Sequence, residues 1–145
     1  MAKVTGGEKL QAYLREMAAK MRQPASVDVG WLDGATYPDG TPVALVACTN
    51  EYGRPGQPPR PAIRGMIADK SPEWGRQAGE LLKANGYDLA RTMEHMGAAI
   101  KGQMQEAITA YAGPALKPST IQRKGFDKQL IDQGIELAGI DYQVK

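Results

Sequence analysis

The feature that most constrains this fold is a long apolar stripe in the second half of the chain. The stripe consists of Leu89, Met93, Met96, Ile100, Met104, Ala107 and Tyr111. Apolar side chains that recur every three or four residues share one face of an α-helix, and another layer must cover that face. Asp88 provides an N-cap before the stripe, and Gly113-Pro114 ends it. We therefore predict a helix over residues 88–111 that forms one side of the core.

Two strands and a second amphipathic helix complete the expected architecture. Residues 27–31 and 140–144 alternate between apolar and polar side chains, as strands do. Thr5-Gly6-Gly7-Glu8 has the pattern of a capping box and opens a helix expected over residues 6–22. Its apolar residues are Leu10, Tyr13, Leu14, Met17 and Met21. The expected fold class is α+β, with a small, mostly antiparallel sheet packed against the N-terminal helix and the long helix in a single domain, 1–145.

Helix-capping and helix-breaking residues mark where the remaining helices begin and end. Ser71-Pro72 predicts a helix start, because Pro is favoured in the first turn, and Asn85-Gly86 predicts its end. Ser119 and Gln122 form a second capping box that opens a short helix, which Gly125 ends.

Three segments lack a regular pattern. Residues 33–42 carry turn residues and predict a loop or hairpin tip. Residues 43–52 fit either a buried strand or a helix closed by Gly53. Residues 54–62 predict an extended Pro-rich arm, and residues 113–135 predict an irregular segment.

Charge and composition exclude several classes of protein. The chain has 18 basic and 16 acidic residues, which is too balanced for a general binder of nucleic acid or anionic membranes. No apolar run approaches the roughly 18–20 residues of a membrane span. The single cysteine, Cys48, excludes an intrachain disulfide, and we expect it to be buried and inert. The single histidine, His95, is expected on a solvated helix face. We expect no enzymatic activity, because no nucleophile or orienting group stands at a recognisable spacing from this histidine. We also expect no metal, no cofactor and no small-molecule substrate.

Two groups of loop residues are more informative than any catalytic set. Residues 50–53 place a carboxylate, an aromatic ring and a glycine just before the prolines of residues 58–61. We expect Glu51 and Arg60 to pair and so fix the direction of the arm, although an ordinary Pro-rich surface loop is an equal alternative. Residues 117–128 are basic and predict either a solvated loop or a contact with DNA phosphates.

These motifs together resemble the neck and tail-completion family of long-tailed bacteriophages, with its virion-morphogenesis relatives. Residues 50–64, which contain NEYG and PPRPAIR, are similar to the family pattern EFG…PxRPFLR. Residues 116–125 look like LSPSTIxRKG, residues 127–137 look like DKPLIDTGxL, and residues 140–144 match the final strand. The chain departs from the pattern at Ala62, Gln129, Gln133 and Ala138-Gly139.

The resemblance implies a structural protein of the virion, made in the host cytoplasm. It would act at the neck or the head-proximal end of the tail, where it completes the tail and joins it to the capsid as part of a multi-copy ring. The implied partners are other copies of the chain, head-connector or stopper proteins, and tail-tube or tail-terminator proteins. Packaged DNA would lie nearby, and no membrane is involved.

The matched motifs suggest two assembly elements. The first comprises Glu51, Tyr52, Gly53, Arg60 and Pro61, and the second comprises Lys124, Asp127, Lys128, Asp132 and Gly134. Gly53 and Gly134 are expected to supply backbone conformations that other residues resist. Arg60 and Asp132 are candidate ion-pair partners, within one chain or between chains.

Three other functions fit the sequence less well. A tail terminator, the ring that caps the tail tube, belongs to the same structural class. A virion-associated hydrolase would have to use carboxylates alone, as some glycosidases do. A nucleic-acid-binding module would use residues 117–128, and its affinity would fall steeply with salt.

Overall fold

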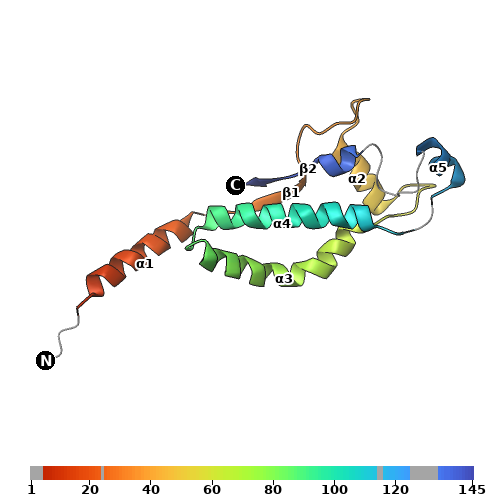
Figure 1. Ribbon diagram of the computed structural model, residues 1–145. Helices are drawn as coiled ribbons and strands as arrows, with labels where there is room; N and C mark the ends of the chain where they lie inside the picture. Colours follow the sequence, from red (N-terminus) through yellow and green to blue (C-terminus); the bar gives the residue numbers. More distant parts are fainter. Residues whose placement is uncertain (1–4, 24, 114–115, 125–133) are drawn as a thin grey trace.

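The computed structural model describes residues 5–23, 25–113, 116–124 and 134–145. The architecture is α+β, as predicted, with a long helix in the second half of the chain (Figure 1). The helices are α1 (Gly7–Arg22), α2 (Val43–Tyr52), α3 (Ala62–Ala84), α4 (Leu89–Ala110), α5 (Pro118–Lys124) and α6 (Ile135–Ala138). The strands are β1 (Val27–Trp31) and β2 (Ile140–Val144), at their predicted positions.

The two strands form an antiparallel sheet that joins the first part of the chain to the last. Val27 lies opposite Val144, and Trp31 lies opposite Ile140. A two-stranded sheet is at best marginally stable in water, so it needs a helix against one face. That helix is α4, which contacts both strands and separates the sheet from α3 (Figure 1).

The core lies on both sides of α4. Its central cluster consists of Ala62, Met66, Met104, Ile108 and Ile140, with Trp31 and Trp74 packed against it. The predicted stripe is confirmed at Met96 and Met104, which are 5% and 4% exposed. The buried set also includes Gly97, where a Cβ atom would lie 2.5 Å from the ring of Tyr142. A glycine at this position therefore lets α4 approach the sheet closely.

The predicted start of α3 is wrong. The helix begins at Ala62, ten residues before Pro72, and continues through this proline with a visible bend (Figure 1). Proline has no N–H, so one helical hydrogen bond is lost and the helix bends. Burial of Ala62 and Met66 against α4 stabilises the preceding turns, which outweighs the local start signal at Ser71. The predicted end at Asn85 and the predicted cap at Asp88 are both confirmed.

α1 does not pack against the sheet, and this part of the expectation is wrong. The helix projects away from the rest of the molecule (Figure 1), and none of its residues is buried. The predicted capping box is also absent, because the N-cap is Gly6 in the left-handed region and no side chain caps the helix. Among the described residues, no helix combines the length and apolar character that crossing a membrane requires.

Residues 43–52 form a helix, which resolves the ambiguity between strand and helix. Val43 and Ala47 of α2 are buried four residues apart, and Gly53 ends the helix. Cys48 lies on another face and is exposed, so the expectation of a buried cysteine is wrong. Residues 33–42 form the predicted loop, in which Thr36 bridges to Pro42.

The segment at residues 54–62 contains a tight turn and contacts α2 again before α3 begins. Arg54 and Gln57 close a tight turn through reciprocal backbone hydrogen bonds of 3.0 and 2.8 Å. The Arg60 N–H then donates to the Asn50 carbonyl at 2.6 Å. The prolines thus shape a return from α2 to α3 that is held to α2 at Asn50.

The predicted short helix after residue 116 is confirmed, but its cap is not. α5 begins at Pro118, and the Lys117 carbonyl accepts hydrogen bonds from the N–H groups of Thr120 and Ile121. Ser119 therefore lies inside the first turn of the helix. The predicted end at Gly125 lies outside the described residues.

Candidate assembly site

Glu51 is the centre of the first motif. Its side chain, near the end of α2, faces the start of α3, where Pro61 provides no side-chain cap. Its carboxylate accepts hydrogen bonds from the N–H groups of Ile63 at 2.6 Å and Arg64 at 3.2 Å. These donors have no partner within a helix, and an N-terminus favours a negative charge. Glu51, which is 8% exposed, thus stabilises the start of α3 from a different helix.

The cation that pairs with Glu51 is Arg64, so the predicted pair with Arg60 is wrong. Arg64 Nε lies 3.3 Å from Glu51 Oε2, and its Nη2 donates to the Glu51 carbonyl at 2.5 Å. The same guanidinium lies 4.5 Å from the centre of the Tyr52 ring. α3 begins immediately after the proline segment, so its first turn brings Arg64 to Glu51, while Arg60 belongs to the extended residues before it.

Gly53 supplies the conformation that was expected of it. Its φ is 76°, a region that side chains disfavour. A Cβ atom here would lie 2.9 Å from the Gln57 carbonyl oxygen and from the Pro59 nitrogen. Any other residue would therefore open the turn that returns the chain from α2 to α3.

Arg60 is the least satisfied polar side chain of the first motif. It is 9% exposed, and its Nε has no hydrogen-bond partner among the described residues. It lines a groove of about 620 Å³ that both motifs share. Cationic side chains in the lining are Arg54, Arg60, Lys117 and Arg123, and the acidic ones are Asp39 and Glu136. The local charge is thus positive.

The second motif reaches the first through the short helix α6. Gly134 has a φ of 72° and forms the left-handed N-cap of α6, as expected. Glu136 is 4% exposed, and its Oε2 accepts a hydrogen bond from Asn50 Nδ2 at 3.3 Å. The Glu136 backbone carbonyl accepts a second bond from the Trp31 indole at 2.9 Å. Residues 86 positions apart therefore meet between α2 and α6.

The other predicted assembly residues differ in how exposed they are and in whether the structure describes them. Tyr52 is 64% exposed, whereas Glu51 and Arg60 are buried. Lys124 is the last residue of α5, and Asp127, Lys128 and Asp132 lie outside the described residues, as does the pairing proposed for Asp132. Of the first motif, Tyr52 is thus the residue that offers a large surface to a neighbour.

The sequence did not single out three residues that connect the elements of this site. They are Asn50 and Glu136, which join α2 to α6, and Arg64, which joins α3 to α2. Asn50 and Arg64 stand inside the quoted motif, so their presence there was the available signal. Glu136 carried no such signal, because a glutamate in a short helix is usually solvated. Its burial follows from the packing of α6 against α2 and Trp31.

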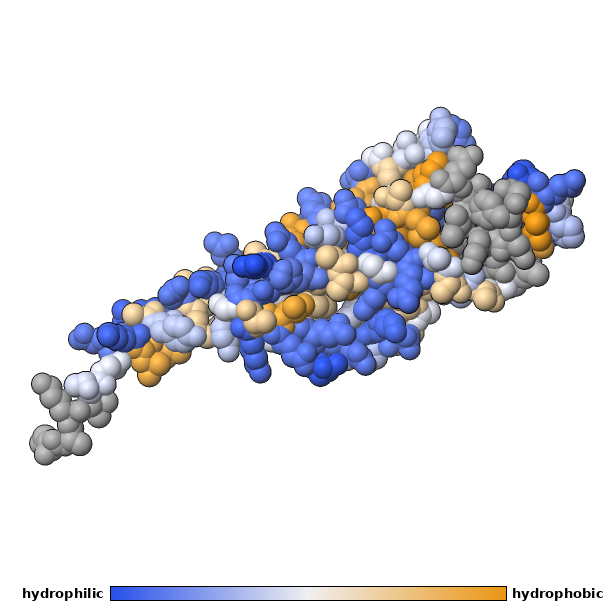
Figure 2. All heavy atoms as spheres, viewed as in Figure 1, coloured by the Kyte–Doolittle hydropathy of each residue, from blue (hydrophilic) through white to orange (hydrophobic). Residues whose placement is uncertain are grey.

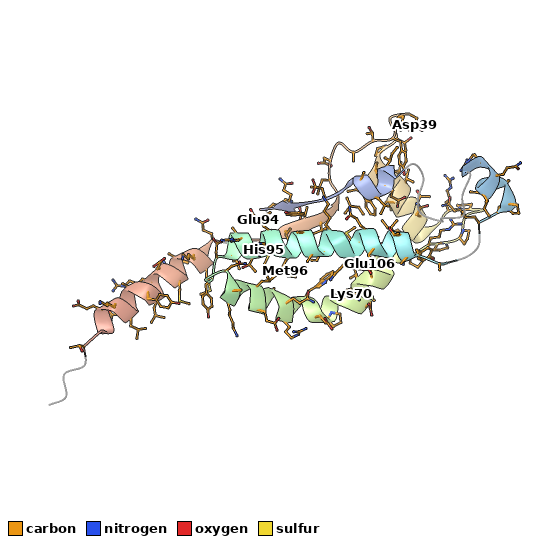
Figure 3. The ribbon with its side chains drawn as sticks, in the orientation of Figure 1. Asp39, Lys70, Glu94, His95, Met96 and Glu106 are labelled. Carbon is orange, nitrogen blue, oxygen red and sulfur yellow. The ribbon has the colours of Figure 1, made fainter. Side chains whose placement is uncertain are left out.

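Several other titratable groups lie away from the pair of Glu51 and Arg64. Figure 3 shows Glu94 and His95 near the end of α4 that faces α1, and Asp39 on the loop near α2. His95 is exposed, as predicted, and approaches Asn85. The N–H and hydroxyl of Thr41 lower the pKa of Asp39 through hydrogen bonds. The described residues contain no cluster of three or more histidine, cysteine or acidic side chains placed to hold a metal ion.

No protein-family model, curated protein or solved structure matches this chain.

Proposed function

We propose that this chain is a structural virion protein of the phage neck or the head-proximal end of the tail. It completes the tail and joins it to the capsid as one copy in a ring. The proposal rests on the resemblance of residues 50–64 and 116–144 to the two motifs of that family. The proposed role requires no catalytic step, metal or cofactor.

One observation supports the proposal more than any other. The two motifs are far apart in the sequence, yet Asn50 of the first donates to Glu136 of the second. Both motifs also line the same groove, through Arg60 on one side and Lys117 and Arg123 on the other. The described residues of the two motifs, which are separate in the sequence, therefore meet at one place in the fold.

The direct test is the location of the chain in virus particles. Particles released by cells that encode the chain would be purified and imaged by cryo-electron microscopy, and the copies of the chain counted. A symmetric set of copies between the head connector and the tail tube is the expected result. A single ring on the end of a finished tube would favour the tail terminator, and absence from the particle would overturn both.

A deletion sharpens this test. Cells that lack the chain should accumulate filled heads and separate tails, because the junction between them is incomplete. Full infectivity without the chain would contradict the proposal. Binding of the purified chain to DNA that falls steeply with salt, or hydrolysis of cell wall, would favour the alternative functions.

A further inference from the structure

The exposed large hydrophobic side chains of the described residues fall into two separate groups. Four of them lie on α1. The other three lie where α2 meets α3, and we call these three residues the α2–α3 patch. The α1 group is Leu10, Tyr13, Leu14 and Met21, and the α2–α3 patch is Leu45, Tyr52 and Ile67. Their exposed fractions run from 42% to 64%. Large apolar side chains gathered in this way mark surfaces that another molecule covers.

The group on α1 forms a continuous ridge. Leu10, Leu14 and Met21 recur at spacings of four and seven, so they share one helix face. Figure 2 shows hydrophobic surface along this helix, outside the main body. Most helical stability in proteins comes from packing of an amphipathic face, so a covering surface would stabilise the 16 residues of α1.

The α2–α3 patch is also one surface. Leu45 and Tyr52 are seven residues apart and therefore lie on the same face of α2. Arg64 stacks on the Tyr52 ring at 4.5 Å, and Ile67 follows Arg64 by one turn of α3. The patch thus crosses from one helix to the other through a cation–π contact.

The two surfaces lie at opposite ends of the molecule. Figure 1 shows α1 leaving one end of α4 while α2 lies near the other end. α1 is about 24 Å long and points away from the body, so it does not cover the patch of its own chain. An apolar ridge and an apolar patch on one chain, each unpartnered, can cover each other between two copies.

We infer that the apolar face of α1 in one copy packs on the α2–α3 patch of a second copy of this chain. The two surfaces differ, so the contact is heterologous: each copy gives its α1 to one neighbour and receives α1 from another. Such contacts produce a closed ring when the rotation between copies closes. The inference deepens the proposed ring and rests on the proposed function only for the number of copies.

The area involved indicates how strongly two copies associate. Aromatic side chains bury roughly 150–250 Å² each, so seven side chains of about this size or smaller, each roughly half exposed, would bury at most about 700 Å² together. Stable specific interfaces bury roughly 1,200–2,000 Å². One contact alone is therefore weak, and a closed ring, in which every copy holds two contacts, is much more stable. We expect a monomer in dilute solution and larger assemblies at high concentration.

The chain carries its own probe for this contact. Cys48, the only cysteine, is exposed on α2, three residues after Leu45 and four before Tyr52. A thiol introduced by Leu14→Cys would lie close enough to Cys48 of the neighbour to form a disulfide, which requires a Cα separation of roughly 4.4–6.8 Å. Ala19→Cys places the same thiol on the opposite face of α1 and is the matched control.

The cross-linking test distinguishes the possible contacts. Mild oxidation of the full-length Leu14→Cys chain should give a ladder of covalent multimers, with position 14 joined to position 48 of another copy. Ala19→Cys should give few such products. Bonds between two copies of position 14, bonds from 14 to 48 within one chain, or no bonds at high concentration would each overturn the inference.

Two complementary variants test whether α1 of one copy contacts the α2–α3 patch of the next copy. Leu10→Asp disables α1, and Leu45→Asp disables the α2–α3 patch, so each variant alone should stay monomeric. At high concentration, where even a single weak contact forms, a mixture of the two should give a 1:1 dimer and nothing larger, because one good surface remains on each. Circular dichroism checks that both variants fold, and a mixture that stays monomeric at the concentration where the unaltered chain assembles would contradict the inference.

Virions separate the failure of this inference from that of the proposed function. Cross-links in the purified chain with no chain in the particle would leave the contact standing and remove the neck role. A chain found in the neck whose Leu14→Cys variant forms no bond to position 48 there would keep the neck role and overturn the contact.

Discussion

α1 and α4 are both amphipathic helices, yet they lie in opposite environments. α4 buries Met96, Met104 and Ile108 between the sheet and α3. α1 buries none of its residues and carries an apolar face into solvent. Helical periodicity therefore predicts that a helix needs a partner, but not whether the partner belongs to the same chain. Replacing matched residues on the two helices gives the sharpest test of this difference.

The largest effect is expected at the packed helix. Ile108→Ala removes most of a side chain that is 2% exposed and leaves a cavity in the core, so the free energy of unfolding should fall by about 2–5 kcal/mol. Leu14→Ala, on α1 and 53% exposed, should change it by less than about 0.5 kcal/mol in dilute solution. Urea unfolding of both variants measures the difference. Equal losses would mean that α1 packs in the monomer.

The next effect tests the polar connection between α2 and α3. Glu51→Gln replaces a carboxylate that accepts from Ile63, Arg64 and the Arg64 guanidinium with an amide that has only one acceptor oxygen. The free energy of unfolding should fall by about 1.5–3 kcal/mol. Glu73→Gln, at an exposed ion pair, is the control and should cost less than about 1 kcal/mol. A loss at position 51 no larger than at position 73 would contradict the capping role.

A smaller effect is expected at the turn that follows α2. Gly53→Ala and Gly56→Ala both place a side chain at positive φ, 76° and 80°. Only the first also brings a Cβ within 2.9 Å of other backbone atoms. We expect Gly56→Ala to cost about 1 kcal/mol and Gly53→Ala about 1–2 kcal/mol more. Thermal unfolding measures both, and equal losses would mean that the close approach relaxes freely.

The smallest effect concerns the ion pair between α4 and β2. Lys101 Nζ lies 3.1 Å from Asp141 Oδ1, and this contact lowers the pKa of Asp141 below its usual 3.8. Because the pKa is lower in the folded state, the stabilisation is present above the unfolded pKa and is lost as the pH falls through the folded value. NMR titration of the Asp141 carboxyl should show this shift, and Lys101→Met should reduce it. An unchanged pKa in that variant would contradict the pairing.

The sequence predicted best where the determining interactions are local. The capped stripe of α4, the alternation of β1 and β2 and the stop at Asn85 all depend on residues within a few positions of one another. The start of α3 was missed because its N-terminus is stabilised by Glu51 from another helix. Its passage through Pro72 was missed because burial of Met66 outweighs a lost hydrogen bond.

The candidate site divides in the same way. Gly53 and Gly134 were predicted from their positions in the motifs, since a sharp turn requires glycine whatever surrounds it. The partner of Glu51 was not predicted correctly, because Arg60 and Arg64 are both within reach of Glu51 along the chain. Only the position of the α3 start selects Arg64.

By itself, the sequence determined the long helix α4, the two strands and the stop at Asn85, and it indicated that both amphipathic helices need a covering layer. Only the tertiary structure decided where that cover comes from. It buries α4 within the chain, brings Asn50 to Glu136, and leaves α1 and the α2–α3 patch uncovered. The reason is physical: periodicity and caps act over one or two helical turns, whereas burial depends on every surface that competes for the same apolar face.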